Sequence, residues 1–215
     1  MITENCTISE PGKYLFLDID GVINSERSNL KYGKQWSDST QEFKYEVLNY
    51  MKEQMELIQE SGFRYGKLHL ARARSVERFG IGVEGGTKPD SRAMSHLNTL
   101  CRDVPSIKMI VSSTWRVDST VEELKEIFKL WGLQTPERIC GKIADGYDRP
   151  RETEILEWLS EQGLQLKNLI AEKDIAVLDD MDDMGTLNSC FVKTDHMNGF
   201  CADDLNKLLN LYGRG

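Results

Sequence analysis

The feature that most constrains the fold is a set of short runs that are apolar at nearly every position. Three of them cover residues 14–17, 107–111 and 175–178, and a weaker one covers residues 190–192. A strand with one solvent-exposed face alternates apolar and polar residues, whereas a strand covered on both faces is apolar throughout. The runs therefore predict strands of a parallel sheet with helices on both sides.

Segments with apolar residues at helical spacing lie between and after these runs. They cover residues 91–102, 121–131, 152–161 and 203–212. Strands that alternate with helices along a chain form right-handed crossover units. We therefore expect an α/β fold with a Rossmann-like, doubly wound parallel sheet.

The chain between the first two strands is longer than one crossover connection needs. Residues 39–60 read as one helix, residues 66–79 read less clearly as a second, and a glycine-rich piece follows. We interpret this stretch as a mostly helical cap inserted into the fold. The expected domains are an α/β core of residues 1–35 and 88–215 and a cap of residues 36–87.

Composition argues against several broad classes. The formal net charge of -8 argues against non-specific binding to nucleic acids or membranes, where a basic face is expected. No apolar run is long enough for a membrane span, and the N-terminus lacks the order of a signal peptide. The five cysteines have no CxxC spacing, which predicts reduced thiols, no zinc site and a cytoplasmic protein. A GxGxxG match at residues 80–85 follows no strand, so no dinucleotide site is expected.

Two aspartates, Asp18 and Asp20, follow the first apolar run in the sequence LFLDIDGVIN. Ligands of open α/β sheets bind beyond the carboxyl ends of the strands, so both carboxylates are expected to point toward a site. Two close carboxylates repel each other unless a cation lies between them or one is protonated, and oxygen ligands suit Mg²⁺. The alternative interpretation is a strand followed by an ordinary Asp-Gly turn.

Further polar groups follow the second and third runs. In VSSTWR, the hydroxyl of Ser112 or of Ser113 is placed to bind a phosphate oxygen, although either serine also suits a helix N-cap. Asp179 and Asp180 begin an acidic run that ends at Asp183. We interpret this run as a cation site rather than a solvated loop, because a cation relieves repulsion among its carboxylates.

Arginines precede the helix predicted at residues 152–161. The helix dipole disfavours positive charge at this end, and an anionic ligand would explain Arg151 or Arg149. The alternative interpretation is a surface arginine that pairs with Glu154 or Asp148.

Taken in the order of the sequence, these four signals resemble the haloacid dehalogenase (HAD) superfamily. The pattern of that superfamily is DxD, then Ser or Thr, then Lys or Arg, then an acidic pair. The sequence resembles in particular the HAD domain of "Swiss Army Knife" RNA repair proteins. The shared features are LFLDIDGVIN, VSSTWR, an RxxEI..WL helix, VLDD and a late Thr…Gly element at Thr194 and Gly199. The resemblance covers residues 14–24 and 89–209 and excludes the insertion.

This resemblance implies a phosphatase that works through an aspartyl-phosphate intermediate. Asp18 would be the nucleophile, Asp20 the general acid and base, and Mg²⁺ the cofactor. Asp20 argues against transport ATPases, which carry a threonine there, and against dehalogenases, which lack the second aspartate. The other implied roles are phosphate binding by Ser112 or Ser113, charge neutralisation by Arg151 or Arg149, substrate binding by Arg116, and Mg²⁺ ligation by Asp18, Asp20, Asp179 and Asp180.

The substrate is constrained mainly by charge in the insertion. Its first half is acidic, and its second half is basic and holds Arg72, Arg74 and Arg78. Either the halves pair with each other or the basic half receives an extended anionic substrate. Arginine suits phosphate because its planar fork binds two oxygens. We therefore expect a phosphorylated macromolecule, protein or RNA, with a small-metabolite phosphatase, a phosphomutase and a non-enzymatic phosphate-binding scaffold as alternatives.

Overall fold

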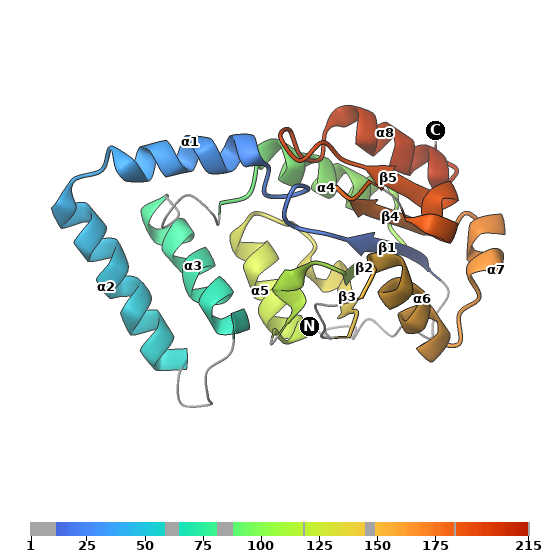
Figure 1. Ribbon diagram of the computed structural model, residues 1–215, viewed down its shortest axis with the longest axis horizontal. Coiled ribbons are helices and arrows are strands. Elements are labelled where there is room, and N and C mark those ends of the chain that lie inside the picture. Colours follow the sequence, from blue (N-terminus) through green and yellow to red (C-terminus); the bar gives the residue numbers. More distant parts are fainter. Residues whose placement is uncertain are drawn as a thin grey trace.

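Five parallel strands form one sheet in the order β3-β2-β1-β4-β5 within the described part of the chain (Figure 1). The computed structural model describes residues 12–58, 65–80, 88–117, 119–144, 149–182 and 184–214. The chain adds strands on one side of β1 first and on the other side afterwards, so the predicted doubly wound α/β fold is confirmed. The strands are β1 (Lys13–Leu17), β2 (Ile107–Val111), β3 (Ile139–Lys142), β4 (Ile175–Asp179) and β5 (Phe191–Lys193).

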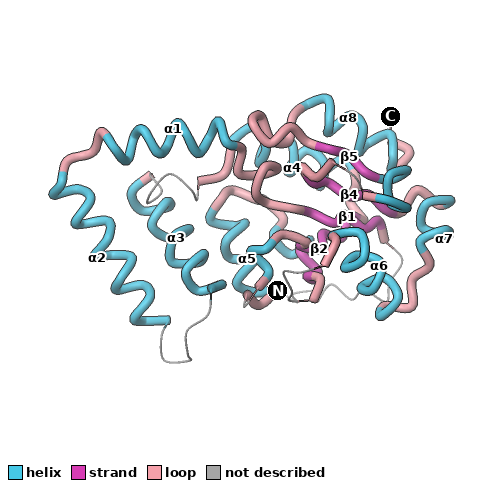
Figure 2. The backbone as a smooth tube through the Cα atoms, viewed as in Figure 1, coloured by secondary structure: helices cyan, strands magenta, loops and turns pink. Residues whose placement is uncertain are grey.

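Helices cover both faces of this sheet, and a group of further helices extends beyond one side (Figure 2). The helices are α1 (Glu26–Ser37), α2 (Gln41–Ile58), α3 (Tyr65–Phe79), α4 (Ser91–Asp103), α5 (Val121–Leu130), α6 (Arg151–Glu161), α7 (Leu166–Ala171) and α8 (Ala202–Leu211).

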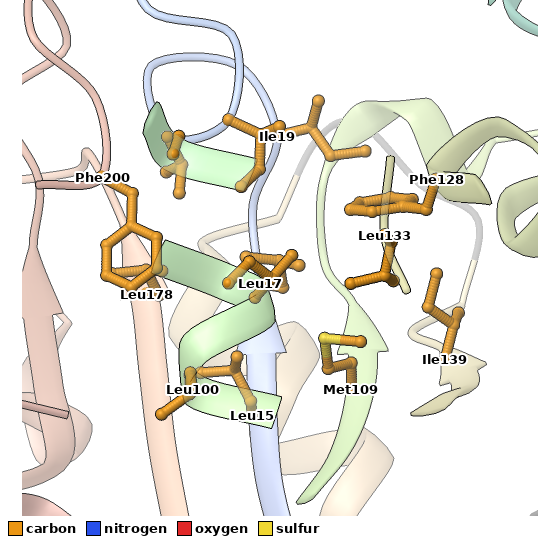
Figure 3. Close-up of a cluster of buried hydrophobic side chains, with 14 of the residues drawn as sticks. Leu15, Leu17, Ile19, Leu100, Met109, Phe128, Leu133, Ile139, Leu178 and Phe200 are labelled. Carbon is orange, nitrogen blue, oxygen red and sulfur yellow. The ribbon is translucent and has the colours of Figure 1, made fainter. Parts of the chain in front are cut away.

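Successive residues of β1 serve opposite faces of the sheet, because side chains of a strand alternate in direction. Leu15 and Leu17 belong to a core with residues of α4, α5 and α8, part of which Figure 3 shows. Tyr14 and Phe16 belong to a second core with residues of α6 and α7. Every position of β2 and β4 is buried. The continuously apolar runs therefore mark strands that are covered on both sides, as predicted.

The sequence prediction missed three elements. β3 has four residues that include Gly141, and its burial alternates, so it gives no continuous apolar signal. Most residues of α1 are polar or charged and only two of them are buried, which leaves little apolar periodicity to detect. α7 has six residues and is too short to show helical periodicity.

The helices α1, α2 and α3 form the extension beside the sheet (Figure 1). α3 packs between α2 and α5. Arg74 of α3 forms an ion pair with Glu126 of α5 at 2.7 Å and donates a hydrogen bond to Gln54 of α2. The guanidinium of Arg78 lies 4.6 Å from the ring centre of Tyr50. These two arginines therefore connect α3 to α2, and Arg74 also connects α3 to α5 of the core.

Within the described residues, no helix combines the length and the apolar character that crossing a membrane requires. Cys101, Cys190 and Cys201 are free thiols, whereas Cys140 is disulfide-bonded. The prediction of five reduced thiols is therefore wrong at Cys140. The GxGxxG match, apart from its first glycine, and the predicted residues Asp148 and Asp183 lie outside the described residues.

Candidate active site

Three predicted site residues form a row across neighbouring strands. Leu17 of β1 pairs with Val111 of β2 and with Leu178 of β4. The next residues, Ser112, Asp18 and Asp179, therefore stand at the same level at the carboxyl ends of these strands. The strand order reverses between β1 and β4, and ligands of open α/β sheets bind at such a switch point.

The row brings acidic side chains together in a buried place. Asp18 and Asp179 are 6% and 1% exposed, and their carboxylate oxygens lie within 4.8 Å of each other and of an oxygen of Asp180. Burial and the neighbouring Asp179 raise the pKa of Asp18, and Arg151 opposes this shift. Burial also raises the pKa of Asp179, again against Arg151. Among the described residues, the cluster holds more negative charge than its one contacting cation offsets.

That cation is Arg151, the first residue of α6. Its Nη2 atom lies 3.7 Å from Asp18 Oδ1, and its Nε atom lies 3.3 Å from Asp179 Oδ2. Nη1 contacts Glu154 Oε2 at 3.4 Å. A single guanidinium thus reaches both buried aspartates, which is the reason a positive charge is tolerated at the start of this helix.

Asp20 stands at the open side of the site. Its side chain is exposed, although protein packed around the carboxyl group raises its pKa by desolvation. Trp115 Nε1 donates a hydrogen bond to Asp20 Oδ2 at 3.0 Å, and Asn24 Nδ2 approaches Oδ1 at 3.5 Å. These two donors favour the ionised form and oppose the upward pKa shift.

The turn after Asp20 depends on a glycine. Gly21 has φ +72°, and a Cβ atom there would lie 2.1 Å from Asp180 Oδ2. Thr194 Oγ1 donates a hydrogen bond to the Gly21 carbonyl oxygen at 3.1 Å. Gly199 approaches the same turn so closely that a Cβ atom would lie 2.7 Å from the Val22 carbonyl oxygen. The late Thr…Gly element therefore supports the DxD turn through the carbonyl oxygens of Gly21 and Val22.

A pocket of about 360 Å³ opens onto this cluster. Asp18, Asp20, Asp180 and Arg151 line it, and α1 contributes Glu26 and Asn29. The structure thus brings four of the predicted residues to one pocket.

The remaining predicted residues divide into two groups. Ser112 is fully buried at the level of Asp18, and its Oγ atom has no hydrogen-bond partner among the described residues. Ser113 Oγ accepts a hydrogen bond from Trp115 N at 3.4 Å and is occupied as a cap. Of the two serines, Ser112 therefore keeps a hydroxyl available for a ligand.

Arg116 and Arg149 do not reach the pocket. Arg116 is 1% exposed, and its guanidinium donates hydrogen bonds to the carbonyl oxygens of Ser112 and Ala144 and to Glu154. It stabilises the carboxyl ends of the strands and does not bind a substrate in the pocket. Arg149 is exposed and pairs with Glu157, so Arg151 is the arginine that the structure brings to the site.

Sequence reasoning missed Trp115 and Asn24 as partners of Asp20. Trp115 reads as a core residue, and it is indeed buried, yet its indole N–H reaches the carboxylate. Its position in VSSTWR, four residues after the end of β2, was the available signal. Asn24 closes the motif LFLDIDGVIN, and only the turn at Gly21 brings it back to Asp20.

The chemistry of the cluster fits Mg²⁺. Asp18, Asp179 and Asp180 offer carboxylate oxygens, the hard ligands that this cation prefers. Asp179 Oδ2 is buried and lacks a hydrogen-bond donor among the described residues, although Arg151 Nε lies near it. A divalent cation would relieve the repulsion that raises the pKa of Asp18.

Comparisons with known proteins place the chain in a family. No curated protein matches the sequence. Among solved structures, the crystal structure of the defluorinating L-2-haloacid dehalogenase Rha0230 is similar at 13% identity and a TM-score of 0.37, over 89% of this chain and 80% of that one. The family model described as "HAD domain in Swiss Army Knife RNA repair proteins" matches residues 66–205. The chain therefore belongs to this family and carries a domain of the HAD superfamily.

Proposed function

We propose that the protein is a Mg²⁺-dependent phosphomonoester hydrolase in which Asp18 forms an aspartyl-phosphate intermediate. Membership of the HAD superfamily supports a hydrolase. The observation that carries the phosphatase class is the pairing of two different carboxyl groups, Asp18 and Asp20, at one pocket. Asp18 is buried beside Asp179 and Arg151, whereas Asp20 is exposed and hydrogen-bonded.

The two carboxyl groups divide the reaction into two steps. In the first step, an oxygen of Asp18 attacks phosphorus, the bond to the leaving oxygen breaks, and Asp20 donates its proton to that oxygen. In the second step, Asp20 takes a proton from water, and the water oxygen attacks phosphorus. This releases inorganic phosphate and restores the Asp18 carboxylate.

Neighbouring groups reduce the repulsion between Asp18 and the phosphate. Arg151 already lies against Asp18 and Asp179, so its guanidinium is placed to bind phosphoryl oxygens. The free hydroxyl of Ser112 stands at the same level and is a second donor. When bound by Asp18, Asp179, Asp180 and the Asp20 carbonyl group, Mg²⁺ would supply positive charge next to the transferred phosphoryl group.

For the substrate we propose a phosphate at the end of an RNA chain. The matched family is described by RNA repair proteins, which favours RNA over a phosphoprotein. Arg74 and Arg78 of α3 do not support this choice, because both are engaged within the fold. Cations on α1 support it instead. Arg27 and Lys31 line a second polar pocket of about 310 Å³ together with Arg92 of α4.

The phosphatase proposal predicts Mg²⁺-dependent release of phosphate from p-nitrophenyl phosphate. EDTA should stop it, and Asp18→Asn should lower kcat by about 10³-fold or more, because an amide is neither a carboxylate nucleophile nor a good Mg²⁺ ligand. Acid quenching with labelled substrate should trap phosphate on the wild-type protein and none on the variant. Substantial activity of Asp18→Asn in Mg²⁺ would refute the assignment of Asp18.

The RNA proposal predicts that loss of the α1 cations changes KM for a large substrate and not for a small one. Reversing Arg27 and Lys31 to glutamate should raise KM for an oligonucleotide with a terminal phosphate about tenfold or more and leave p-nitrophenyl phosphate within about twofold. Lys34→Glu is the control, since Lys34 lies on the same helix, pairs with Asp38 and does not line the pocket. Preference for phosphopeptides over oligonucleotides would overturn the choice of RNA.

A further inference from the structure

The side chain of Trp115 connects the proposed acid, Asp20, with the insertion. Trp115 belongs to the 3-10 turn Thr114–Arg116 that follows β2, and it is 4% exposed. Its backbone is fixed at both ends, because Ser113 Oγ accepts from its N–H and Ser119 Oγ donates to its carbonyl oxygen at 2.7 Å. The indole N–H therefore reaches Asp20 from a rigid base.

Two aromatic neighbours fix the plane of the indole ring. His69 of α3 stacks on it with ring centres 4.0 Å apart and an interplanar angle of 18°. Trp131 meets it edge-on at 5.0 Å and 66°. Burial and the nearby Arg72 lower the pKa of His69 to about 4. The stacked imidazole is therefore neutral near neutral pH and brings no charge of its own to Asp20.

The hydrogen bond distinguishes the two oxygens of Asp20. An indole N–H is a donor and never an acceptor, so Asp20 Oδ2 is held as the acceptor of Trp115. A protonated Asp20 must then carry its proton on Oδ1. Among the described residues, Oδ1 accepts only the long hydrogen bond from Asn24 Nδ2, at 3.5 Å against 3.0 Å for the bond from Trp115. This weaker bond is the easier of the two to replace by a proton, and Asp20 lines the same pocket as Asp18.

We propose that Trp115 is a positioning residue that fixes which oxygen of Asp20 carries the transferred proton, and that His69 of the insertion holds the Trp115 ring in that orientation. The inference rests on the proposed function, in which Asp20 protonates the leaving oxygen. It gives the insertion a part in proton transfer in addition to any part in admitting substrate.

The test compares two tryptophans in one aromatic cluster. Trp115→Phe keeps a ring for His69 to stack on and removes the N–H. Trp131→Phe makes the same chemical change, but Trp131 Nε1 donates to no acceptor among the described residues. Each variant is assayed with p-nitrophenyl phosphate and with phenyl phosphate, whose leaving group needs a proton more.

The positioning role predicts a leaving-group bias. Trp115→Phe should lower kcat/KM for phenyl phosphate about tenfold or more and for p-nitrophenyl phosphate by less than about threefold. In an Asp20→Asn background it should cost nothing further, because both changes remove the same contribution. Trp131→Phe should show no bias. Equal losses on both substrates, or the same bias in Trp131→Phe, would overturn the inference.

The His69 pair keeps the inference testable if Trp115→Phe does not fold. His69→Ala removes the stacked ring and should reproduce the bias, whereas His69→Phe keeps a ring and should restore the wild-type ratio of the two substrates. Identical ratios in the two His69 variants would refute the proposal. Failure of the proposed function looks different, since activity would then be absent in wild type or insensitive to Asp18→Asn.

Discussion

At the scale of single residues, the main feature of the site is its excess of negative charge. Asp18, Asp179 and Asp180 converge, and Arg151 alone among the described cations contacts two of them. The raised pKa of Asp18 and of Asp179 records this imbalance. A carboxylate must be ionised to attack phosphorus, so the proposed reaction needs more positive charge than Arg151 supplies among the described residues. This is the physical reason for a cation in the proposed mechanism.

His69 gives a residue-scale prediction about stability and pH. Its folded pKa of about 4 lies below the ordinary value of 6.5, so the unfolded chain binds a proton that the folded chain does not. This makes the free energy of unfolding fall as pH decreases from about 6.5 toward 4. His69→Phe should lose less of its unfolding free energy over that range than wild type, as measured by urea denaturation at several pH values. Parallel curves for the two proteins would show that His69 titrates normally when folded.

At the scale of elements, the DxD turn is held by close backbone approaches. Gly21 leaves room for Asp180, and Gly199 leaves room for the Val22 carbonyl oxygen. Phe200 N also donates to the Val22 carbonyl oxygen at 2.9 Å. The turn after β1 and the segment after β5 are thus fitted to each other, although they are far apart in the sequence. A Cβ atom added at Gly21 must displace Asp180, and one added at Gly199 must displace the backbone of the turn at Val22.

Two glycine substitutions distinguish the effect of the close approach to Asp180 from the effect of backbone strain alone. Gly21→Ala and Gly163→Ala both place a side chain at positive φ, which costs about 1–2 kcal/mol, but only Gly21 has an atom within 4 Å of the added Cβ. Gly163→Ala should lower the free energy of unfolding by about that amount and keep kcat. Gly21→Ala should in addition lower kcat by more than about tenfold, because Asp180 must move. Equal kcat values for both variants would show that the Asp180 position does not matter.

At the scale of the whole molecule, the acidic cluster joins strands from the two halves of the sheet. Asp18 follows β1, and Asp179 ends β4, on either side of the point where strand order reverses. A cation bound there would hold both halves, and a ligand that binds only the folded state stabilises the whole fold. If the site holds Mg²⁺ as proposed, cation binding and the stability of the sheet are therefore coupled.

This coupling predicts a melting temperature that depends on Mg²⁺. At about 100 times its Kd, Mg²⁺ should add roughly 2.7 kcal/mol, which raises Tm by roughly 5–10 °C in a chain of this size. Asp179→Asn should remove most of the rise. Asp182→Asn should keep it, because Asp182 is exposed and pairs with Lys193 instead. A rise of equal size in Asp179→Asn would place the cation elsewhere.

The sequence by itself determined the sheet and the order of its motifs. Doubly covered strands need apolar residues at nearly every position, so β1, β2 and β4 could be predicted. Asp18, Asp179 and the pair Ser112 and Ser113 followed from their ends, and only the structure distinguished the two serines. Only the tertiary structure decided which of several similar side chains reach the site, because packing sets their surroundings. Arg116 and Arg151 carry the same charge in the sequence, yet one is buried against carbonyl oxygens and the other faces two aspartates. The link from His69 through Trp115 to Asp20 joins three segments whose contact no local pattern encodes, because it exists only once α3 has packed beside the ends of the strands.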